Sequence, residues 1–373
     1  MSEEKRAKLP FYSPRIWHGM SAGVWFRFLH QNGYAVAPKF WPMATAISAA
    51  SLFNSTMGLL SELFNGRSAT NTELESPPIF VLGHWRTGTT MLHELLVQDS
   101  QFSYPTTYQC MAPHHFMLTS STVGPIIDVL MPKHRPMDNM VLGYSRPQED
   151  EFALVNLGVT SNYLDWAFPN RKVDYNNWLT LQDLSQDEIS SWKQQFRWFL
   201  KRLNAFDPRQ QVLKSPTHTA RVKILLELFP DAKFIHIVRN PFSVLPSTLR
   251  MWTRMTDSLA FQTRKVDITL EDRIEVFQMM YERFYAEQSL IPDQNFVELR
   301  FEDLVADPVG EMRAIYEKLS LGEFEKAEPG ILEYLESTKD FQGNKHNLSP
   351  EVEGSIKSGC AEYMRRYGYA ESQ

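Results

Sequence analysis

Short apolar runs alternate with helical patterns through the middle of the chain. Residues 79–82 (IFVL) are uniformly apolar, as is typical of a strand buried on both faces of a sheet. A glycine-containing stretch follows, and then apolar residues at helical spacing over 91–97. The pattern returns as a strand at 211–214, a helix over 217–229 and a strand at 234–238. Such alternation predicts an α/β fold with a central parallel sheet flanked by helices.

Polar and proline-rich stretches divide this pattern into regions. Residues 66–78 (GRSATNTELESPP) read as a connector, which predicts a helical N-terminal extension over 1–77 and a main domain over 78–373. Residues 103–209 are rich in His, Trp and Tyr and poor in strand patterning, so we expect a helical cap inserted above the site. A further strand is predicted at 295–300, followed by C-terminal helices.

The extension contains one long uncharged segment. No residue from Phe40 to Ser61 is charged, but Ser, Thr and Asn residues interrupt the segment, which is too polar to predict a membrane span. Apolar residues recur at roughly helical spacing across 40–64, namely Met43, Ile47, Ala50, Met57, Leu60 and Phe64. We interpret 40–64 as a helix packed on the domain, with a helix lying on a membrane surface as the alternative.

Composition and charge narrow the function classes. With 43% hydrophobic and 22% charged residues, the chain is typical of a soluble globular protein. The 38 Lys and Arg against 44 Asp and Glu give a net charge of -6, so no general attraction for nucleic acid is expected and any anion must be bound locally. Cys110 and Cys360 are too few and too far apart for a disulfide framework or a metal cluster, which predicts a reducing, cytoplasmic location.

The strongest motif follows the first strand. Residues 83–90 (GHWRTGTT) have the spacing of a phosphate-binding P-loop, except that Thr89 stands where the motif has Lys. Its glycines permit a tight turn, and the loop amides and the next helix N-terminus converge on a phosphate. Arg86 supplies a cation from within the loop. A kinase would need the Lys and an acidic residue for magnesium, but the neighbouring strand ends in Arg239.

A second anion site is predicted one strand away. Arg239 ends the strand at 234–238, and Ser247 follows eight residues later, two turns into the helix that Pro241 begins. A guanidinium and a hydroxyl in this arrangement can hold one phosphate together.

These motifs together carry a family resemblance. The segments HWRTGTT, LKSPTHTA, HIVRNPFSVLPSTLRMW and LRFEDLVADP resemble successive motifs of sulfotransferases that use 3′-phosphoadenosine-5′-phosphosulfate (PAPS). The likeness spans 78–369 and is nearest to the bacterial family whose loop carries Arg, as in tyrosylprotein sulfotransferases. It implies that the 5′-phosphosulfate is bound by loop residues Arg86, Thr87, Gly88, Thr89 and Thr90. It also implies that the 3′-phosphate is bound by Arg239 and Ser247, completed by Lys345.

The resemblance also assigns catalytic groups. Sulfuryl transfer needs positioning and neutralisation of negative charge, with no metal required. By motif match, Lys214 is the second catalytic cation beside Arg86. For the general base we expect His218, four residues after that lysine, with Glu151 as the rival at the start of a cap helix. The acids at 149–151 can also be read simply as first-turn residues that complement a helix dipole.

The predicted function is therefore transfer of a sulfuryl group from PAPS to a hydroxyl, or an amine, of an acceptor such as a carbohydrate or a lipid. An alternative within enzymes is a P-loop kinase using magnesium-ATP. A non-enzymatic alternative is a membrane-surface binding module that uses the N-terminal helix. Acceptor identity and oligomeric state are not encoded in the motifs, because cap residues carry no transferable code.

Overall fold

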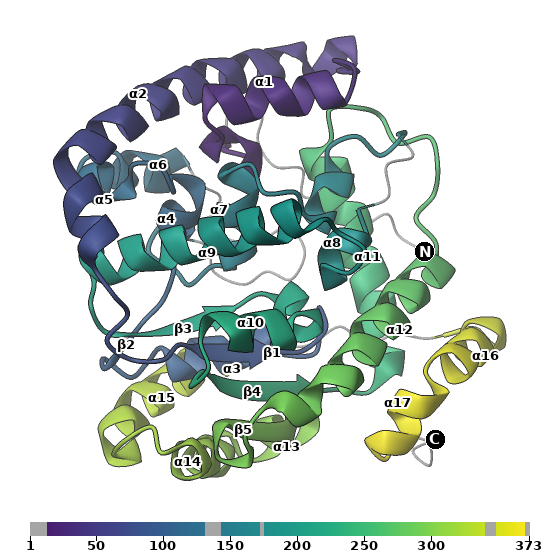
Figure 1. The fold of residues 1–373 in the computed structure, drawn as a ribbon. Coiled ribbons are helices and arrows are strands. Elements are labelled where there is room, and N and C mark those ends of the chain that lie inside the picture. The colour runs from purple at the N-terminus through teal and green to yellow at the C-terminus, as the bar shows by residue number, and fades with distance from the viewer. Residues whose placement is uncertain (1–12, 131–142, 172–174, 340–347, 370–373) are drawn as a thin grey trace.

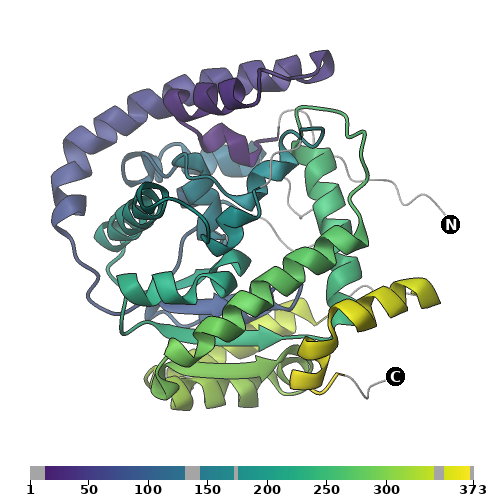
Figure 2. The same cartoon turned by 45° about the vertical axis from the view of Figure 1, so that its right-hand side comes forward.

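The computed structural model describes residues 13–130, 143–171, 175–339 and 348–369 (Figures 1 and 2). Its centre is a parallel sheet of five strands in the order β2-β3-β1-β4-β5. The strands are β1 (Ile79–Leu82), β2 (Phe102–Ser103), β3 (Gln210–Lys214), β4 (Lys233–Val238) and β5 (Phe296–Arg300). The α/β class and the parallel sheet predicted from the sequence are confirmed, and only the short edge strand β2 has no counterpart in the prediction.

Helices surround this sheet and build the cap. They are α1 (Ala22–Gln31), α2 (Trp41–Asn71), α3 (Thr89–Leu96), α4 (Thr107–Met111), α5 (Phe116–Thr119), α6 (Gly124–Leu130), α7 (Asp150–Asn156), α8 (Asn177–Thr180), α9 (Gln186–Phe206), α10 (Val222–Leu228), α11 (Pro241–Leu259), α12 (Leu270–Glu287), α13 (Phe301–Ala306), α14 (Pro308–Leu319), α15 (Phe324–Thr338), α16 (Pro350–Gly359) and α17 (Ala361–Arg366). The 3-10 turns are η1 (Ile16–Gly19), η2 (Pro38–Phe40), η3 (Asn162–Trp166), η4 (Pro216–Ala220), η5 (Gln288–Leu290) and η6 (Asp293–Asn295).

Both faces of the sheet are buried, as the continuous apolar run of β1 requires. Ile79 and Val81 point to the side covered by α3, α14 and α15, whereas Phe80 and Leu82 point to the side covered by α9, α10 and α12. All four residues of β1 are fully buried. The sheet is therefore a rigid platform, and the loops at the carboxyl ends of its strands are held in fixed places.

The segment after β3 departs from its predicted form. Instead of one helix over 217–229, the chain makes the 3-10 turn η4 and then α10. Arg221 breaks the helical geometry between them, with φ −134° and ψ 20°. Thr217, His218 and Arg221 are all buried and bind acidic side chains of α7, so tertiary contacts override the local helical preference here.

The long helix α2 lies along one outer edge of the molecule in both views (Figures 1 and 2). Its inner side contacts α1, η1, α5 and α9. Residues Pro38–Asn71 form a helical segment that is long and apolar enough to cross a membrane, with a mean hydropathy of 1.2 over its most apolar 18 residues. Of these 18 residues, 17% are buried against the protein. Most of these 18 residues are thus exposed or only partly buried.

Candidate active site

The loop between β1 and α3 needs glycine at two places. Gly83 has φ +148°, and a Cβ there would stand 2.7 Å from the carbonyl oxygen of Ile237. Gly88 has φ +105°, and a Cβ there would stand 2.3 Å from the ring of Phe301. Neither position can accept a side chain without moving its neighbours. Between them, Arg86 adopts φ +71°, a left-handed conformation that is uncommon for a residue with a side chain and is concentrated at functional sites.

Three residues predicted to bind the donor meet at this loop. The Nε of Arg86 donates a hydrogen bond to the Oγ of Ser247 at 3.0 Å, and the Nη1 of Arg239 donates to the carbonyl oxygen of Arg86 at 3.2 Å. The guanidinium of Arg239 lies over the ring of Phe301, 4.0 Å from its centroid, and burial lowers the pKa of Arg239 from its ordinary value. An arginine remains charged under such a shift, so two cations converge here.

The other predicted donor residues are distributed around the loop. The Oγ1 of Thr87 donates to the carbonyl oxygen of His84 at 2.7 Å, which braces the loop from inside. Thr89 and Thr90 line a cavity beside the loop. Lys345 lies outside the described residues.

Lys214 stands at the carboxyl end of β3 and binds an acid of the cap. Its Nζ is 2.7 Å from the Oε1 of Glu149, which is the residue just before α7. The hydroxyl of Tyr163 donates to the Oε2 of Glu149 at 2.5 Å, and the indole Nε1 of Trp85 donates to the Tyr163 oxygen at 2.9 Å. Burial, together with the charge of Glu149, raises the pKa of Tyr163 well above its ordinary value, so this hydroxyl stays protonated and keeps donating.

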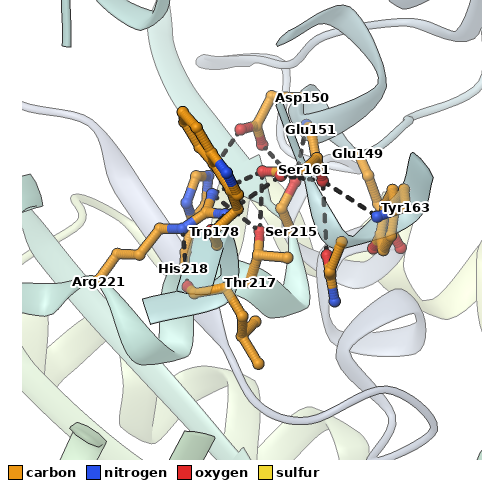
Figure 3. A network of polar contacts seen from close by, with 12 residues as sticks. Glu149, Asp150, Glu151, Ser161, Tyr163, Trp178, Ser215, Thr217, His218 and Arg221 are labelled. Atoms are coloured by element: carbon orange, nitrogen blue, oxygen red, sulfur yellow. Dashed lines mark hydrogen bonds and ion pairs between the residues drawn. The ribbon is translucent and has the colours of Figure 1, made fainter. Parts of the chain in front are cut away.

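His218 occupies a different environment (Figure 3). Its side chain is fully buried, its Nε2 lies 2.6 Å from the Oδ2 of Asp150, and its ring packs against Phe80 and Phe196 with centroids 5.4 Å away in both cases. Burial alone would raise the pKa of Asp150, but its attraction to His218 and hydrogen bonds from that residue and Ser215 lower the pKa below its ordinary value. His218 is not among the residues that line the cavity.

Glu151 is also buried and belongs to the same polar network as His218 (Figure 3). Its two oxygens accept hydrogen bonds from both terminal nitrogens of Arg221 at 2.7 and 3.2 Å. The hydroxyls of Ser161 and Thr217 donate to the same carboxylate at 2.5 and 3.0 Å. Burial would raise the pKa of Glu151, but the attraction of Arg221 together with hydrogen bonds from Arg221 and Ser161 lowers that pKa below its ordinary value. Like His218, Glu151 does not line the cavity, so both residues expected as the general base lie behind the cavity wall.

Glu149 is the acid that does reach the cavity. Its side chain is 15% exposed, and it lines a cavity of about 170 Å³ together with Arg86. Sequence reasoning passed over Glu149 because three successive acids begin α7 and nothing in the sequence shows which of them faces the site. The missed partners Tyr163 and Trp85 carried no motif signal of their own, although Trp85 lies within the loop segment.

The cavity is mainly apolar. The cavity begins at the glycine loop. Its other walls are formed by the cap, by α11 and by the segment that precedes η1. Its apolar lining residues include Pro14, Ile16, Trp85, Met111, Phe152, Trp166, Met251, Met255 and Leu259. Polar residues line it both beside the loop, as Arg86 and Glu149 do, and before η1, as Ser13 and Arg15 do. A cavity with mainly apolar walls and a small number of polar groups is typical of a site that binds an apolar molecule and orients it.

The fold and the site together define a group-transfer enzyme of the α/β class, with cations gathered at a glycine loop. Residues 77–326 match the model of the Sulfotransferase family. The chain belongs to this family and is a sulfotransferase, so the kinase and the non-catalytic binding module considered from the sequence are set aside.

Relatives agree with this assignment along nearly the whole chain. The chain is 39% identical over 354 residues to proteins of Mycobacterium bovis and Mycobacterium tuberculosis named omega-hydroxy-beta-dihydromenaquinone-9 sulfotransferase, covering 95% of this chain and 91% of each relative.

Solved structures share the fold. The sulfotransferase STF9 of Mycobacterium avium matches with a TM-score of 0.69 at 20% identity, over 93% of this chain and 96% of that one. The sulfotransferase STF1 of Mycobacterium tuberculosis matches with a TM-score of 0.61 at 19% identity, over 94% of each chain.

Proposed function

We propose that this sulfotransferase moves a sulfuryl group from PAPS to a hydroxyl group carried by a lipid. The observation that carries the proposal is the position of Glu149, which joins the cation Lys214 at one oxygen and lines the apolar cavity beside Arg86. This arrangement supplies a base and the cation Arg86 at the wall of a cavity suited to an apolar acceptor, with Lys214, which does not itself line the cavity, bound to that base. Supporting it, the mycobacterial relatives at 39% identity are named for a hydroxylated menaquinone derivative.

The donor site in this proposal is the loop and its neighbours. Arg86, Thr87, Gly88, Thr89 and Thr90 hold the phosphosulfate, because loop amides and a helix N-terminus favour an anion there. Arg239 and Ser247 hold the 3′-phosphate. The contacts of Arg86 with both of these residues support one continuous donor site. Lys345 is retained as a third ligand of the 3′-phosphate.

The proposed chemistry assigns each side chain a separate task. A bound acceptor hydroxyl gives its proton to the carboxylate of Glu149, in place of His218 or Glu151. As its oxygen forms a bond to sulfur, the bond from sulfur to the donor's 5′-phosphate breaks and the phosphate keeps the electron pair. Lys214 and Arg86 neutralise the charge that spreads over the transferring group, so no metal is included. Both oxygens of Glu149 are hydrogen-bonded, but each carboxylate oxygen has two lone pairs, and the remaining ones can accept the proton.

Two further proposals concern the setting of the enzyme. We place the reaction in the cytoplasm, since Cys110 and Cys360 are both unpaired and buried. The boundary between an extension over 1–77 and a sulfotransferase domain over 78–373 also remains a proposal.

A ligand-binding experiment tests the donor. Adenosine 3′,5′-bisphosphate, the desulfated donor, should raise the melting temperature, and magnesium-ATP should do so weakly, because a ligand that binds only the native state stabilises it. Arg239→Ala should weaken bisphosphate binding roughly 10- to 100-fold, the scale of a hydrogen bond to a charged group. Arg313→Ala, which removes an arginine of α14 paired with Glu325 and Glu328, is the matched control. A bisphosphate response unchanged in Arg239→Ala would contradict the donor site.

A panel of acceptors tests the lipid assignment. Long-chain alcohols and hydroxylated isoprenoids should be sulfated, and their turnover should exceed that of sugars and short peptides because only the former bury apolar surface in the cavity. Equal turnover of a sugar and a long-chain alcohol would contradict a lipid acceptor while leaving the donor assignment intact.

A further inference from the structure

The helix α2 carries its polar residues on the inside. The Nδ2 of Asn54 donates to the carbonyl oxygens of His18 and Met20 at 2.6 and 3.0 Å. The Oγ of Ser55 accepts from the backbone N–H of Ala22 at 2.8 Å. An ordinary surface helix of a soluble protein has the opposite arrangement, with apolar residues toward the core. Several of the polar residues that interrupted the hydrophobic pattern of α2, among them Asn54 and Ser55, are therefore contacts to the protein.

The opposite side of α2 is apolar and open to the surroundings. Leu59, Leu63 and Phe64 are 75%, 76% and 70% exposed. We define the outer face of α2 by its exposed large apolar residues, Leu52, Phe53, Leu59, Leu60, Leu63 and Phe64. Residues 52, 59, 60 and 63 are spaced so that they share one side of the helix. Along the whole helix the charged residues are Glu62 and Arg67.

The character of the outer face indicates what covers it. A protein interface of ordinary size carries about one hydrogen bond per 100–200 Å² and a polar rim. The outer face offers little of this, since even the Oγ1 of Thr56 donates back to the carbonyl oxygen of Leu52 at 3.0 Å. Hydrocarbon needs no hydrogen-bonding partner. At the N-terminal end of α2, Trp41 is 60% exposed and Lys39 is also exposed, a combination enriched at membrane interfaces.

The same helix is connected to the acceptor cavity. Asn54 holds the carbonyl oxygen of His18 in η1. Ile16 of η1 lines the cavity, as do Ser13 and Arg15 just before it. The layer of chain that contains η1 therefore lies between the cavity and α2 and contacts both of them.

We propose that the outer face of α2 lies on a lipid bilayer, with the helix parallel to the surface and its inner side still packed on the protein. The choice of a bilayer over a second copy of this chain rests in part on the proposed lipid acceptor. The polar inner side explains why α2 does not cross the membrane, because crossing would break the hydrogen bonds of Asn54 and Ser55.

Flotation of the full chain with vesicles tests the proposal. The wild type should bind phosphatidylcholine vesicles, and binding should persist in roughly 0.5 M salt because the outer face is apolar and uncharged interactions are not screened. The double variant Leu59→Glu/Leu63→Glu should bind at least tenfold more weakly. Both side chains are about three-quarters exposed, so their replacement leaves the interior unchanged. The thermal response to adenosine 3′,5′-bisphosphate should stay as in the wild type.

A matched variant controls for charge. Val305→Glu/Leu332→Glu adds the same two charges at exposed apolar positions of α13 and α15, at the opposite end of the molecule from α2 (Figure 1). It should bind vesicles as the wild type does. The proposal would be overturned if the wild type did not bind vesicles, or if both variants lost binding equally. It would also be overturned if the wild type were a dimer that Leu59→Glu/Leu63→Glu converts to a monomer while lipid binding stays unchanged. Vesicle binding does not depend on the donor, so its failure and a failure of the bisphosphate response are separate results.

Discussion

Three consecutive acids at the start of α7 lie in two environments. The difference distinguishes the acid that a substrate can reach from the two that hold the structure together. Asp150 and Glu151 are fully buried and bonded to His218 and Arg221, with no exposure to the cavity. Glu149 binds Lys214 in a similar ion pair, yet its side chain is 15% exposed and lines the cavity. Glutamate is thus a buried structural ion-pair partner at position 151 and an accessible carboxylate at position 149. Accessibility, and not acidity alone, marks the group that can take a proton.

The two buried pairs also explain how the accessible one is held. Glu149, just before α7, is tied to Lys214 at the end of β3. The next two acids are tied to the segment that follows β3, Asp150 to Ser215 and His218, and Glu151 to Thr217 and Arg221 (Figure 3). The sheet fixes the end of β3, so these ties fix the start of α7 relative to the sheet. The buried part of the network therefore positions the cap, and with it Glu149.

The largest effect is expected where the carboxylate meets the cavity. Glu149→Gln should lower turnover by roughly a hundredfold or more, the scale of a lost general base, while bisphosphate binding remains near that of the wild type. The loss should shrink for acceptors with more acidic hydroxyls, since these need less help to release a proton. A uniform loss across acceptors of different acidity would identify Glu149 as a residue that only positions Lys214.

The next effect is on stability. Glu151→Ala should lower the free energy of unfolding by about 3–5 kcal/mol, because it leaves the guanidinium of Arg221 buried without its partner. Urea denaturation measures this loss. The double variant Glu151→Leu/Arg221→Met should regain most of the stability, since no unpaired charge remains. If Glu151→Ala instead folded as well as the wild type and lost turnover, Glu151 would have the chemical role that we assign to Glu149.

A smaller effect comes from two buried histidines, one in the glycine loop and one beneath α2. Burial lowers the pKa of His84 to about 3 and that of His115 to about 4. In the unfolded chain each titrates near 6.5, so below that pH the unfolded state binds protons that the folded state does not. Stability should therefore fall as pH drops from 6.5 toward 4, by up to about 1.4 kcal/mol per pH unit for each histidine.

Denaturation by urea at pH 7 and pH 5 checks this slope. His84→Asn should flatten it, whereas replacement of the exposed His30 by Gln should not. An equal free energy of unfolding for the wild type at both pH values would contradict the expected destabilisation by histidines that are buried in their neutral form.

The strands and the loop were readable from the sequence because their signals are local. The apolar run of β1 and the strand that ends just before Arg239 match the structure closely, since strands buried on both faces of a parallel sheet are mainly apolar. The residue of α7 that faces the cavity was not readable. Glu149, Asp150 and Glu151 are chemically alike and adjacent, and their directions are set by partners more than 60 residues away, at Lys214 and beyond. The exposed outer face of α2 was likewise hidden, because the sequence pattern does not show which side of a helix is covered.

The smallest effect separates the two oxygens of Glu149. Tyr163→Phe removes the hydrogen bond to Oε2 and leaves Lys214 on Oε1, so the carboxylate keeps its charge and its ion pair. Loss of one hydrogen bond of this kind is worth about 0.5–1.5 kcal/mol, which corresponds to a two- to tenfold fall in turnover. Trp166→Phe, a change in the stacked neighbour of Tyr163 that leaves its hydroxyl in place, is the control and should keep more of the turnover. Equal losses of turnover in both variants would show that Tyr163 acts through packing and not through its hydrogen bond to Glu149.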